Sequence, residues 1–205
     1  MTDHSDSQLD NEIPAEEQAR ADCYAILARL YYDAPDAGLL AAIAGAVAPE
    51  PGNDVFGKSW HDLAAAAAEV RPEAVRSEFD ALFIGTGKAE VTPYMTFYLV
   101  PTGRERILVE LRDELARLGL TRSASATEPE DHIAALFDVM RHLIVSGREN
   151  VALHEEKRFF NRYIRAGYRG LCDAVAASPT AAFYRRVAQF TGVFLDLESE
   201  SFDLL

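Results

Sequence analysis

Residues 128–144 read EPEDHIAALFDVMRHLI, and this stretch decides the fold class. From residue 133 onward the apolar side chains recur at helical spacing and form one buried stripe. They are Ile133, Leu136, Phe137, Met140, Leu143 and Ile144. Thr127 and Glu130 fit a Ser/Thr-x-x-Glu capping box, which predicts a helix that starts there. We therefore expect the polar residues 128–132 at the N-terminal end of a helix whose body is buried.

Two interpretations of this polar group remain open from its own chemistry. Acids in a first helical turn complement the helix dipole, and proline is tolerated there, so ordinary capping explains it. Alternatively, polar side chains fixed to a rigid, buried helix are a means of presenting binding groups. Local chemistry alone favours capping.

Helical periodicity continues along nearly the whole chain and predicts an all-α, single-domain bundle of eight or nine helices. We expect helices at about 14–34, 36–47, 58–70, 72–84, 102–118, 127–146, 150–165, 168–177 and from 178 onward. Thr102 and Glu105 form a second capping box, and Gly119 is the expected stop of that helix. Residues 85–101 form the longest irregular connection. Its aromatic side chains serve either as core plugs or as a recognition surface.

Charge is concentrated at the two ends of this 205-residue chain. The net charge is −13, of which residues 1–20 carry −5 and residues 196–205 carry −4. We assign residues 1–14 to an acidic disordered tail, 15–198 to the helical domain and 199–205 to an acidic C-terminal tail. The acidity argues against nucleic acid as a partner and favours a basic one.

The chain also lacks the signals of export and of membrane insertion. No run approaches the roughly 18 apolar residues of a membrane span, and the N-terminus has no secretory pattern. Cys23 and Cys172 are isolated, with no CxxC and no metal spacing. We expect a reduced, cytoplasmic setting.

Known catalytic and metal-binding motifs are absent from the sequence. No glutamate has a histidine three residues on, and neither HExxH nor GxSxG occurs. The segment 85–88 reads GTGK, but Leu82 and Ala89 break the spacing of a phosphate loop. Asp131 and His132 are adjacent, so on a helix they would point in different directions and make a poor acid/base pair. We predict no catalytic residues, no metal and no cofactor.

Three blocks of sequence resemble the TorD/DmsD family of cytoplasmic chaperones, which assist the maturation of exported molybdenum enzymes. They are EFDALFIG at 78–85, PYMTFY at 93–98 and EPEDH at 128–132. Arg158-Phe159-Phe160 and the pattern from Ser178 to Leu195 are similar to the C-terminal part of the family. The likeness spans roughly residues 20–198.

The chain departs from the family pattern in three places. Residues 163–167 read YIRAG where many members have a proline and a tryptophan, Met95 stands where Glu or Gly is usual, and residues 86–92 differ from the proline-rich form. A different cargo or simple drift accounts for these changes.

The resemblance implies an all-helical protein that binds the twin-arginine signal peptide and the apo form of a molybdenum-containing oxidoreductase. It would assist cofactor insertion and prevent premature export. Carried over by motif, the peptide-binding residues are first Asp131 and His132, with Glu128, Pro129 and Glu130 beside them. The groove residues would be Leu82, Phe83, Gly85, Pro93, Tyr94 and Tyr98. An acidic rim of Glu128, Glu130 and Asp131 would pair with the arginines, and the groove would take the apolar segment.

Other interpretations stay open. Leu82, Phe83 and Gly85 are also explained as core residues and a helix stop. The nitrate-reductase delta-subunit branch of assembly chaperones shares the fold, and a nucleotide-binding or hydrolysing helical protein is a third reading. A homodimer is permitted, since the connection 85–101 is long enough for helix exchange.

Overall fold

The computed structural model describes residues 13–46, 54–85, 88–121, 128–147 and 149–205. These residues form ten α-helices and one π-helical turn, with a single isolated β-bridge between Tyr94 and His132 in place of any strand. Nine of these helices have seven residues or more, so the predicted all-α bundle is confirmed. The helices are α1 Ala15–Tyr32, α2 Ala37–Gly45, α3 Val55–Glu69, α4 Pro72–Phe79, α5 Thr96–Leu99, α6 Arg104–Arg117, α7 Ile133–Ser146, α8 Glu149–Tyr163, α9 Tyr168–Ala177 and α10 Phe183–Asp203, and the π-helical turn is η1 Asp80–Ile84.

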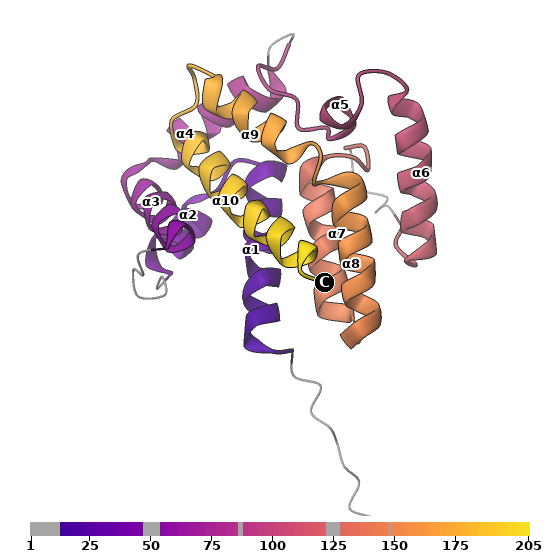
Figure 1. The fold of residues 1–205 in the computed structure, drawn as a ribbon. Helices are drawn as coiled ribbons and strands as arrows, with labels where there is room; N and C mark the ends of the chain where they lie inside the picture. Colours follow the sequence, from indigo (N-terminus) through magenta and orange to yellow (C-terminus); the bar gives the residue numbers. More distant parts are fainter. Residues whose placement is uncertain (1–12, 47–53, 86–87, 122–127, 148) are drawn as a thin grey trace, which may run out of the picture.

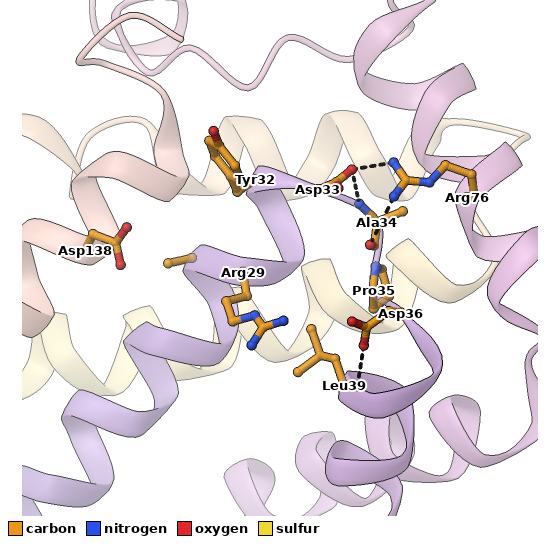
Figure 2. Close-up of a pocket in the computed structure, with 10 residues that line it drawn as sticks. Arg29, Tyr32, Asp33, Ala34, Pro35, Asp36, Leu39, Arg76 and Asp138 are labelled. Carbon is orange, nitrogen blue, oxygen red and sulfur yellow. Dashed lines mark hydrogen bonds and ion pairs between the residues drawn. The ribbon is translucent and has the colours of Figure 1, made fainter. Parts of the chain in front are cut away.

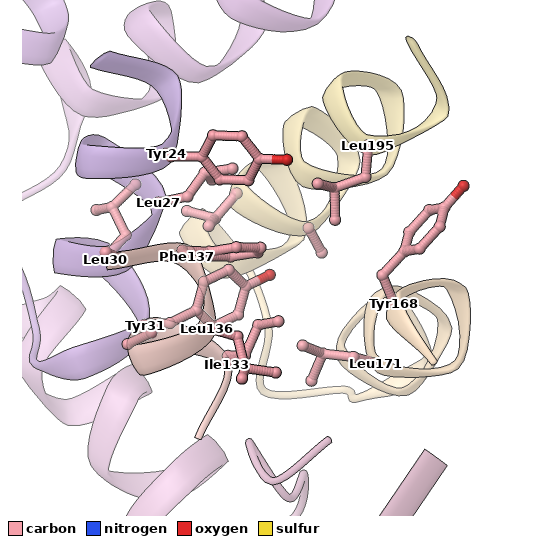
Figure 3. Packing of buried hydrophobic residues seen from close by; sticks show 14 of the residues in the cluster. Tyr24, Leu27, Leu30, Tyr31, Ile133, Leu136, Phe137, Tyr168, Leu171 and Leu195 are labelled. Carbon is pink, nitrogen blue, oxygen red and sulfur yellow. The ribbon is translucent and has the colours of Figure 1, made fainter. Parts of the chain in front are cut away.

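The centre of the bundle is the pair α1 and α7, which pack side by side (Figure 1). Tyr24 and Tyr31 of α1 lie against the ring of Phe137 on α7, with centroid distances of 5.8 and 6.1 Å (Figure 3). Helix α10 crosses α1 and places Phe194 4.9 Å from the Tyr24 ring. The predicted apolar stripe of α7 is buried along its whole length, as its helical spacing requires.

Helix α7 begins later than its capping box predicts. Thr127 lies outside the described residues, and the N-cap is His132, whose Nδ1 accepts a hydrogen bond from the N–H of Ala134 at 3.2 Å. Glu130 lies in the turn before the helix and pairs with Arg112, and the predicted capping box, which needs Thr127, falls outside the described residues. The acidic residues 128–131 therefore precede the helix and do not form its first turn.

Helix α6 has the predicted stop but a different start. Its N-cap is Gly103 with φ +74°, and no side chain caps it, so the box of Thr102 and Glu105 is not formed. At the other end Gly119 has φ +73°, a left-handed conformation that glycine adopts without strain. The N–H of Leu120 donates to the carbonyl of Leu115 at 2.9 Å, which completes a Schellman turn.

Helix α10 begins five residues after the predicted start at Ser178. The carboxylate of Glu78 on α4 accepts hydrogen bonds from the backbone N–H groups of Ala182, Phe183 and Tyr184 at 2.7–3.1 Å. A side chain about 100 residues away in the sequence thus caps this helix. Local sequence could not reveal it.

The C-terminal segment is helical beyond the domain end expected from sequence. Helix α10 continues to Asp203, and Phe202 is buried with its ring 5.2 Å from that of Phe160. Residues 199–203 therefore belong to the bundle and not to a tail. Residues 1–12, most of the predicted N-terminal tail, lie outside the described part of the chain.

The connection after η1 is held against the bundle at several points. The N–H of Val91 donates to the carbonyl of Leu82 at 2.8 Å. Glu90 accepts hydrogen bonds from the hydroxyls of Ser178 and Thr180 at 2.5 and 2.8 Å. The connection also contains the short helix α5, which the sequence pattern did not predict. No helix in the described ranges is long and apolar enough to cross a bilayer.

Candidate functional site

Residues 128–132, the predicted binding pentad, are divided between the protein interior and its surface. Asp131 and His132 are buried, with 3% and 5% of their surface exposed. Glu128, Pro129 and Glu130 are half-buried and line a cavity. These three and the largely buried His132 therefore line a space that a ligand could enter, whereas Asp131 does not.

Asp131 holds the neighbouring loop in place. Its Oδ2 accepts hydrogen bonds from the hydroxyl and the backbone N–H of Thr96, at 2.6 and 3.3 Å. Its backbone carbonyl accepts from the N–H of Met95 at 2.8 Å. A buried carboxylate satisfied in this way positions α5 and is not part of an acidic rim.

His132 combines a cap with a ring contact. Besides capping α7, its ring lies edge-on to Tyr94, with centroids 5.6 Å apart. Burial lowers the pKa of His132, although the acids Glu128 and Asp131 act in the opposite direction. A neutral ring can keep Nδ1 unprotonated, as an acceptor for the Ala134 N–H requires.

Pro93 and Tyr94 connect the loop to the pentad. The carbonyl of Pro93 accepts from the N–H of Ile133 at 2.9 Å, and the hydroxyl of Tyr94 donates to Glu128 Oε2 at 2.5 Å. Burial and this bond to Glu128 raise the pKa of Tyr94 to about 12, so the hydroxyl remains a donor. Tyr94 thus fixes the orientation of the Glu128 carboxylate.

Tyr98 packs beneath helix α9, and two glycines make the approach possible. A Cβ on Gly170 would lie 2.9 Å from Cδ1 of Tyr98, and one on Gly167 would lie 2.6 Å from Cε of Met95. Met95 is fully buried. Met95 and the segment ending at Gly167 are two of the departures from the family pattern, and they lie against each other. The absence of a side chain at Gly167 leaves room for Met95.

Leu82, Phe83 and Gly85 are parts of the core and its connections, and they do not line the cavity beside the pentad. Leu82 is fully buried, and the ring of Phe83 lies 5.3 Å from Tyr184 and 5.9 Å from Tyr31. Gly85 ends η1 with φ +66°, and a Cβ there would lie 2.5 Å from the backbone of Lys88 and Ala89. Packing explains all three, as the structural reading of the sequence expected.

The cavity beside the pentad has a volume of about 320 Å³ and lies between the end of α6 and the outer face of α7. Its walls are mainly apolar, and its acids are Glu128, Glu130 and Asp138. The lining residues that the sequence analysis missed are Tyr32, Leu115, Leu120, Thr121, Ala135, Asp138, Val139 and His142. The one available signal was Ala135 and Val139, which are apolar, four residues apart and outside the buried stripe.

The acid Glu130 already holds a guanidinium. Arg112 of α6 donates through Nε and Nη2 to Oε1 and Oε2 of Glu130, both at 3.1 Å. This is the bidentate geometry that planar guanidinium and carboxylate groups prefer. Arg112 is exposed and does not line the cavity itself, so this pair holds Glu130 from outside the cavity.

Two features of the described residues bear on catalysis, namely the arrangement of potential metal ligands and the state of the thiols. No three His, Cys, Asp or Glu side chains among them converge as metal ligands. Cys23 and Cys172 are free, and burial raises the pKa of each thiol to about 12, which disfavours the nucleophilic thiolate.

Residues 52–173 of the 205 match the family model described as nitrate reductase delta subunit. The chain belongs to this family. The matched range includes all three sequence blocks of the TorD/DmsD resemblance from residue 78 to residue 132, and that resemblance is confirmed.

Curated relatives are named chaperone protein TorD. The protein of Aliivibrio salmonicida is 27% identical over 134 residues, which are 60% of this chain and 61% of the relative. That of Aeromonas salmonicida is 25% identical over 142 residues, 66% and 64% of the two chains. That of Photobacterium profundum is 31% identical over 84 residues, 40% and 38%. The chain thus spans about six tenths of the length of the first two.

Proposed function

We propose that this protein is a chaperone that binds the twin-arginine signal peptide and the apo form of a molybdenum-containing oxidoreductase. In this role it would protect the apo-enzyme during cofactor insertion and delay its export. The family and the names of the curated relatives support a chaperone that does not turn over a substrate. Because those relatives are named TorD, they favour this client class over the nitrate-reductase branch and over nucleotide hydrolysis.

The observation that carries the proposal is the cavity between α6 and α7. A twin-arginine signal combines a cationic end with an apolar stretch. Apolar walls from Leu115, Leu120 and Val139 suit the apolar stretch, and the carboxylates of Glu128 and Glu130 suit the arginines. The volume holds a few side chains, so it is an anchoring point and not a groove for a whole peptide.

We further propose that Asp131 and His132 act through positioning. Asp131 fixes α5 through Thr96, and His132 fixes the start of α7 and the ring of Tyr94. Tyr94 in turn orients Glu128. The motif would then contribute to binding by holding Glu128 and Glu130, its half-buried members that line the cavity, in place.

The test is calorimetry with a synthetic twin-arginine peptide at low and high salt. Affinity should fall as ionic strength rises, since exposed ion pairs are screened. Glu128→Gln combined with Glu130→Gln should weaken binding about tenfold or more with little loss of thermal stability. Glu105→Gln, an exposed acid on α6 outside the cavity, is the matched control and should bind normally.

Asp131→Asn should differ from the cavity variants, because it should lower the melting temperature and the affinity together. Failure of the wild-type protein to bind any twin-arginine peptide or apo-enzyme would contradict the chaperone proposal. Steady nucleotide turnover by the pure protein would favour the enzyme alternative.

A further inference from the structure

A second cavity, of about 360 Å³, lies on the other side of the C-terminal end of α1 (Figure 2). It is lined by Ala28, Arg29, Tyr32, Asp33, Ala34, Pro35, Asp36, Leu39, Arg76 and Asp138. Tyr32 and Asp138 also line the cavity beside the pentad. The two cavities therefore adjoin at these two side chains, and we refer to the adjoining pair, at α1 and α7, as the furrow.

Asp138 is the acid at this junction. In Figure 2 it projects from α7 toward the end of α1, across from Arg29 and Tyr32. Within the described part of the chain its carboxylate makes no hydrogen bond and no ion pair, and Arg141 acts on it only through longer-range attraction. Partial burial raises the pKa of Asp138, because the loss of solvent disfavours the charged form of the carboxylate.

The other acids of the furrow have strong partners within the protein. Glu130 binds Arg112, Glu128 accepts from Tyr94, and Asp33 forms an ion pair with Arg76. Asp36 caps α2 by accepting from the N–H of Leu39 at 2.7 Å. Asp138 is thus the carboxylate of the furrow best able to take a new cation.

Tyr32 supplies an aromatic face at the same place. It is the last residue of α1, and 56% of its surface is exposed although it is a large aromatic side chain. Guanidinium groups stack on aromatic rings and pair with carboxylates at the same time, which ammonium groups do less well. An exposed ring next to an unpaired carboxylate is therefore suited to arginine.

We propose that Asp138 and Tyr32 form an arginine-binding site at the junction of the two cavities, which takes one arginine of the signal peptide. The apolar stretch then lies on Ala135, one helical turn before Asp138, and on Val139, the next residue, both of which line the cavity beside the pentad. This inference rests on the proposed function and identifies the residues that read the cationic end. None of the blocks shared with the family contains either residue.

The test is a cycle of protein and peptide variants. The probe is a synthetic peptide with two adjacent arginines followed by about ten apolar residues, and two further peptides carry glutamine in place of one arginine each. Asp138→Asn should weaken binding of the parent peptide about tenfold. It should have almost no effect on one of the two glutamine peptides, because that peptide has already lost the paired arginine.

The aromatic half of the site has its own pair of variants. Tyr32→Ala should weaken binding about threefold, whereas Tyr32→Phe keeps the ring and should bind normally. Asp113→Asn removes the same charge from an exposed position on α6 outside both cavities and should leave the affinity unchanged. The three positions Tyr32, Asp113 and Asp138 are exposed, so circular dichroism should find the fold of all four variants intact.

The outcomes separate this inference from the proposed function. If the wild-type protein binds the parent peptide and Asp138→Asn binds it equally well, the arginine site is overturned while the chaperone proposal stands. An equal loss of affinity for all three peptides would also overturn it, because Asp138 would then not read an arginine. No binding by the wild-type protein would overturn both.

Discussion

At the scale of single residues, neighbours and burial assign different tasks to side chains adjacent in the sequence. Asp131 and Glu130 are adjacent acids, yet one is buried against Thr96 and the other lines a cavity and pairs with Arg112. A carboxylate in the first situation contributes to structure, and one in the second borders a space that a ligand could enter. Under the proposed function the family motif would therefore contain structural supports as well as ligand contacts.

Arg112 is expected to compete with the ligand for Glu130. Its replacement by glutamine removes the internal guanidinium, so a peptide arginine would no longer have to displace it. Arg112→Gln should therefore bind the twin-arginine peptide several-fold more tightly in calorimetry, an effect of about 1 kcal/mol. Arg106→Gln, on the same helix at an arginine that pairs with Glu110 and not with Glu130, is the control. Weaker binding by Arg112→Gln would mean that the pair orients Glu130 for the ligand.

His132 should make the fold sensitive to acid. Its pKa is lowered in the folded state, so near and below the unfolded value of about 6.5 the unfolded chain binds more protons. This contribution to stability is present above that pH and is lost as the pH falls toward the folded pKa.

His132→Asn is the variant that isolates this effect. Asparagine is a good N-cap, so the variant keeps a side-chain acceptor for Ala134 but cannot titrate. Urea unfolding at about pH 7.5 and about pH 5 should find a smaller loss of stability on acidification in the variant than in the wild type. Equal losses would exclude His132 as a source of the acid sensitivity.

At the scale of elements, contacts from distant parts of the chain decide where helices begin and how closely they pack. Glu78 of α4 caps α10, and Gly167 before α9 and Gly170 within it leave room for the side chains of Met95 and Tyr98. Helix α6 has only Ile107 and Leu111 buried, and ion pairs of Glu114 and Glu155 with Arg117 and Arg158 connect it to α8. The cavity wall formed by α6 thus depends more on charge than the α1–α7 core does.

Removal of the α10 cap should lower global stability. Glu78→Ala leaves three backbone N–H groups without their acceptor and removes a negative charge at a helix N-terminus, a loss of about 1–2 kcal/mol. Chemical denaturation measures this change. Glu73→Ala, an exposed acid in the first turn of the same helix α4, is the control and should cost less. Equal costs would show that the contact with α10 contributes nothing beyond charge.

Close packing of α9 on the α5 loop should depend on Gly170. Gly170→Ala forces the Tyr98 ring to move and should destabilise the fold by about 1–3 kcal/mol, with weaker peptide binding because the loop supports Glu128 through Tyr94. Gly45→Ala, at a helical glycine with open space around it, should be neutral or stabilising in the same thermal melts. If both variants destabilise the fold equally, the cause would be the Gly→Ala change in a helix and not the contact with Tyr98.

At the scale of the whole molecule, one buried ionic network joins the first, eighth and last helices. Arg20 on α1 donates to both oxygens of Glu198 on α10 at 2.8 Å and to Glu156 on α8 at 3.0 Å. Tyr24 adds a hydrogen bond to Glu198 at 2.9 Å. Burial raises the pKa of Glu156, against the influence of Arg20.

Arg20→Met should destabilise the protein strongly, by about 3–5 kcal/mol, because two carboxylates would remain buried without their cation. The control Arg106→Met breaks an exposed pair within α6 and should cost well under about 1 kcal/mol. Denaturant unfolding measures both. A small effect of Arg20→Met would mean that water replaces the guanidinium.

The sequence by itself determined the helical fold class, the buried stripe of α7 and the stop at Gly119, because these follow from the spacing of apolar residues and from backbone conformation within a few residues. It also placed the pentad at the start of α7. Tertiary structure decided which members of the pentad face a cavity, since Thr96 lies 35 residues from Asp131 and the cavity walls come from α1, α6 and α7. Tertiary structure also decided that Glu78 caps α10 and that Asp138 lies where the two cavities adjoin. Burial and charge pairing depend on groups far apart in the chain, and only the folded arrangement brings those groups together.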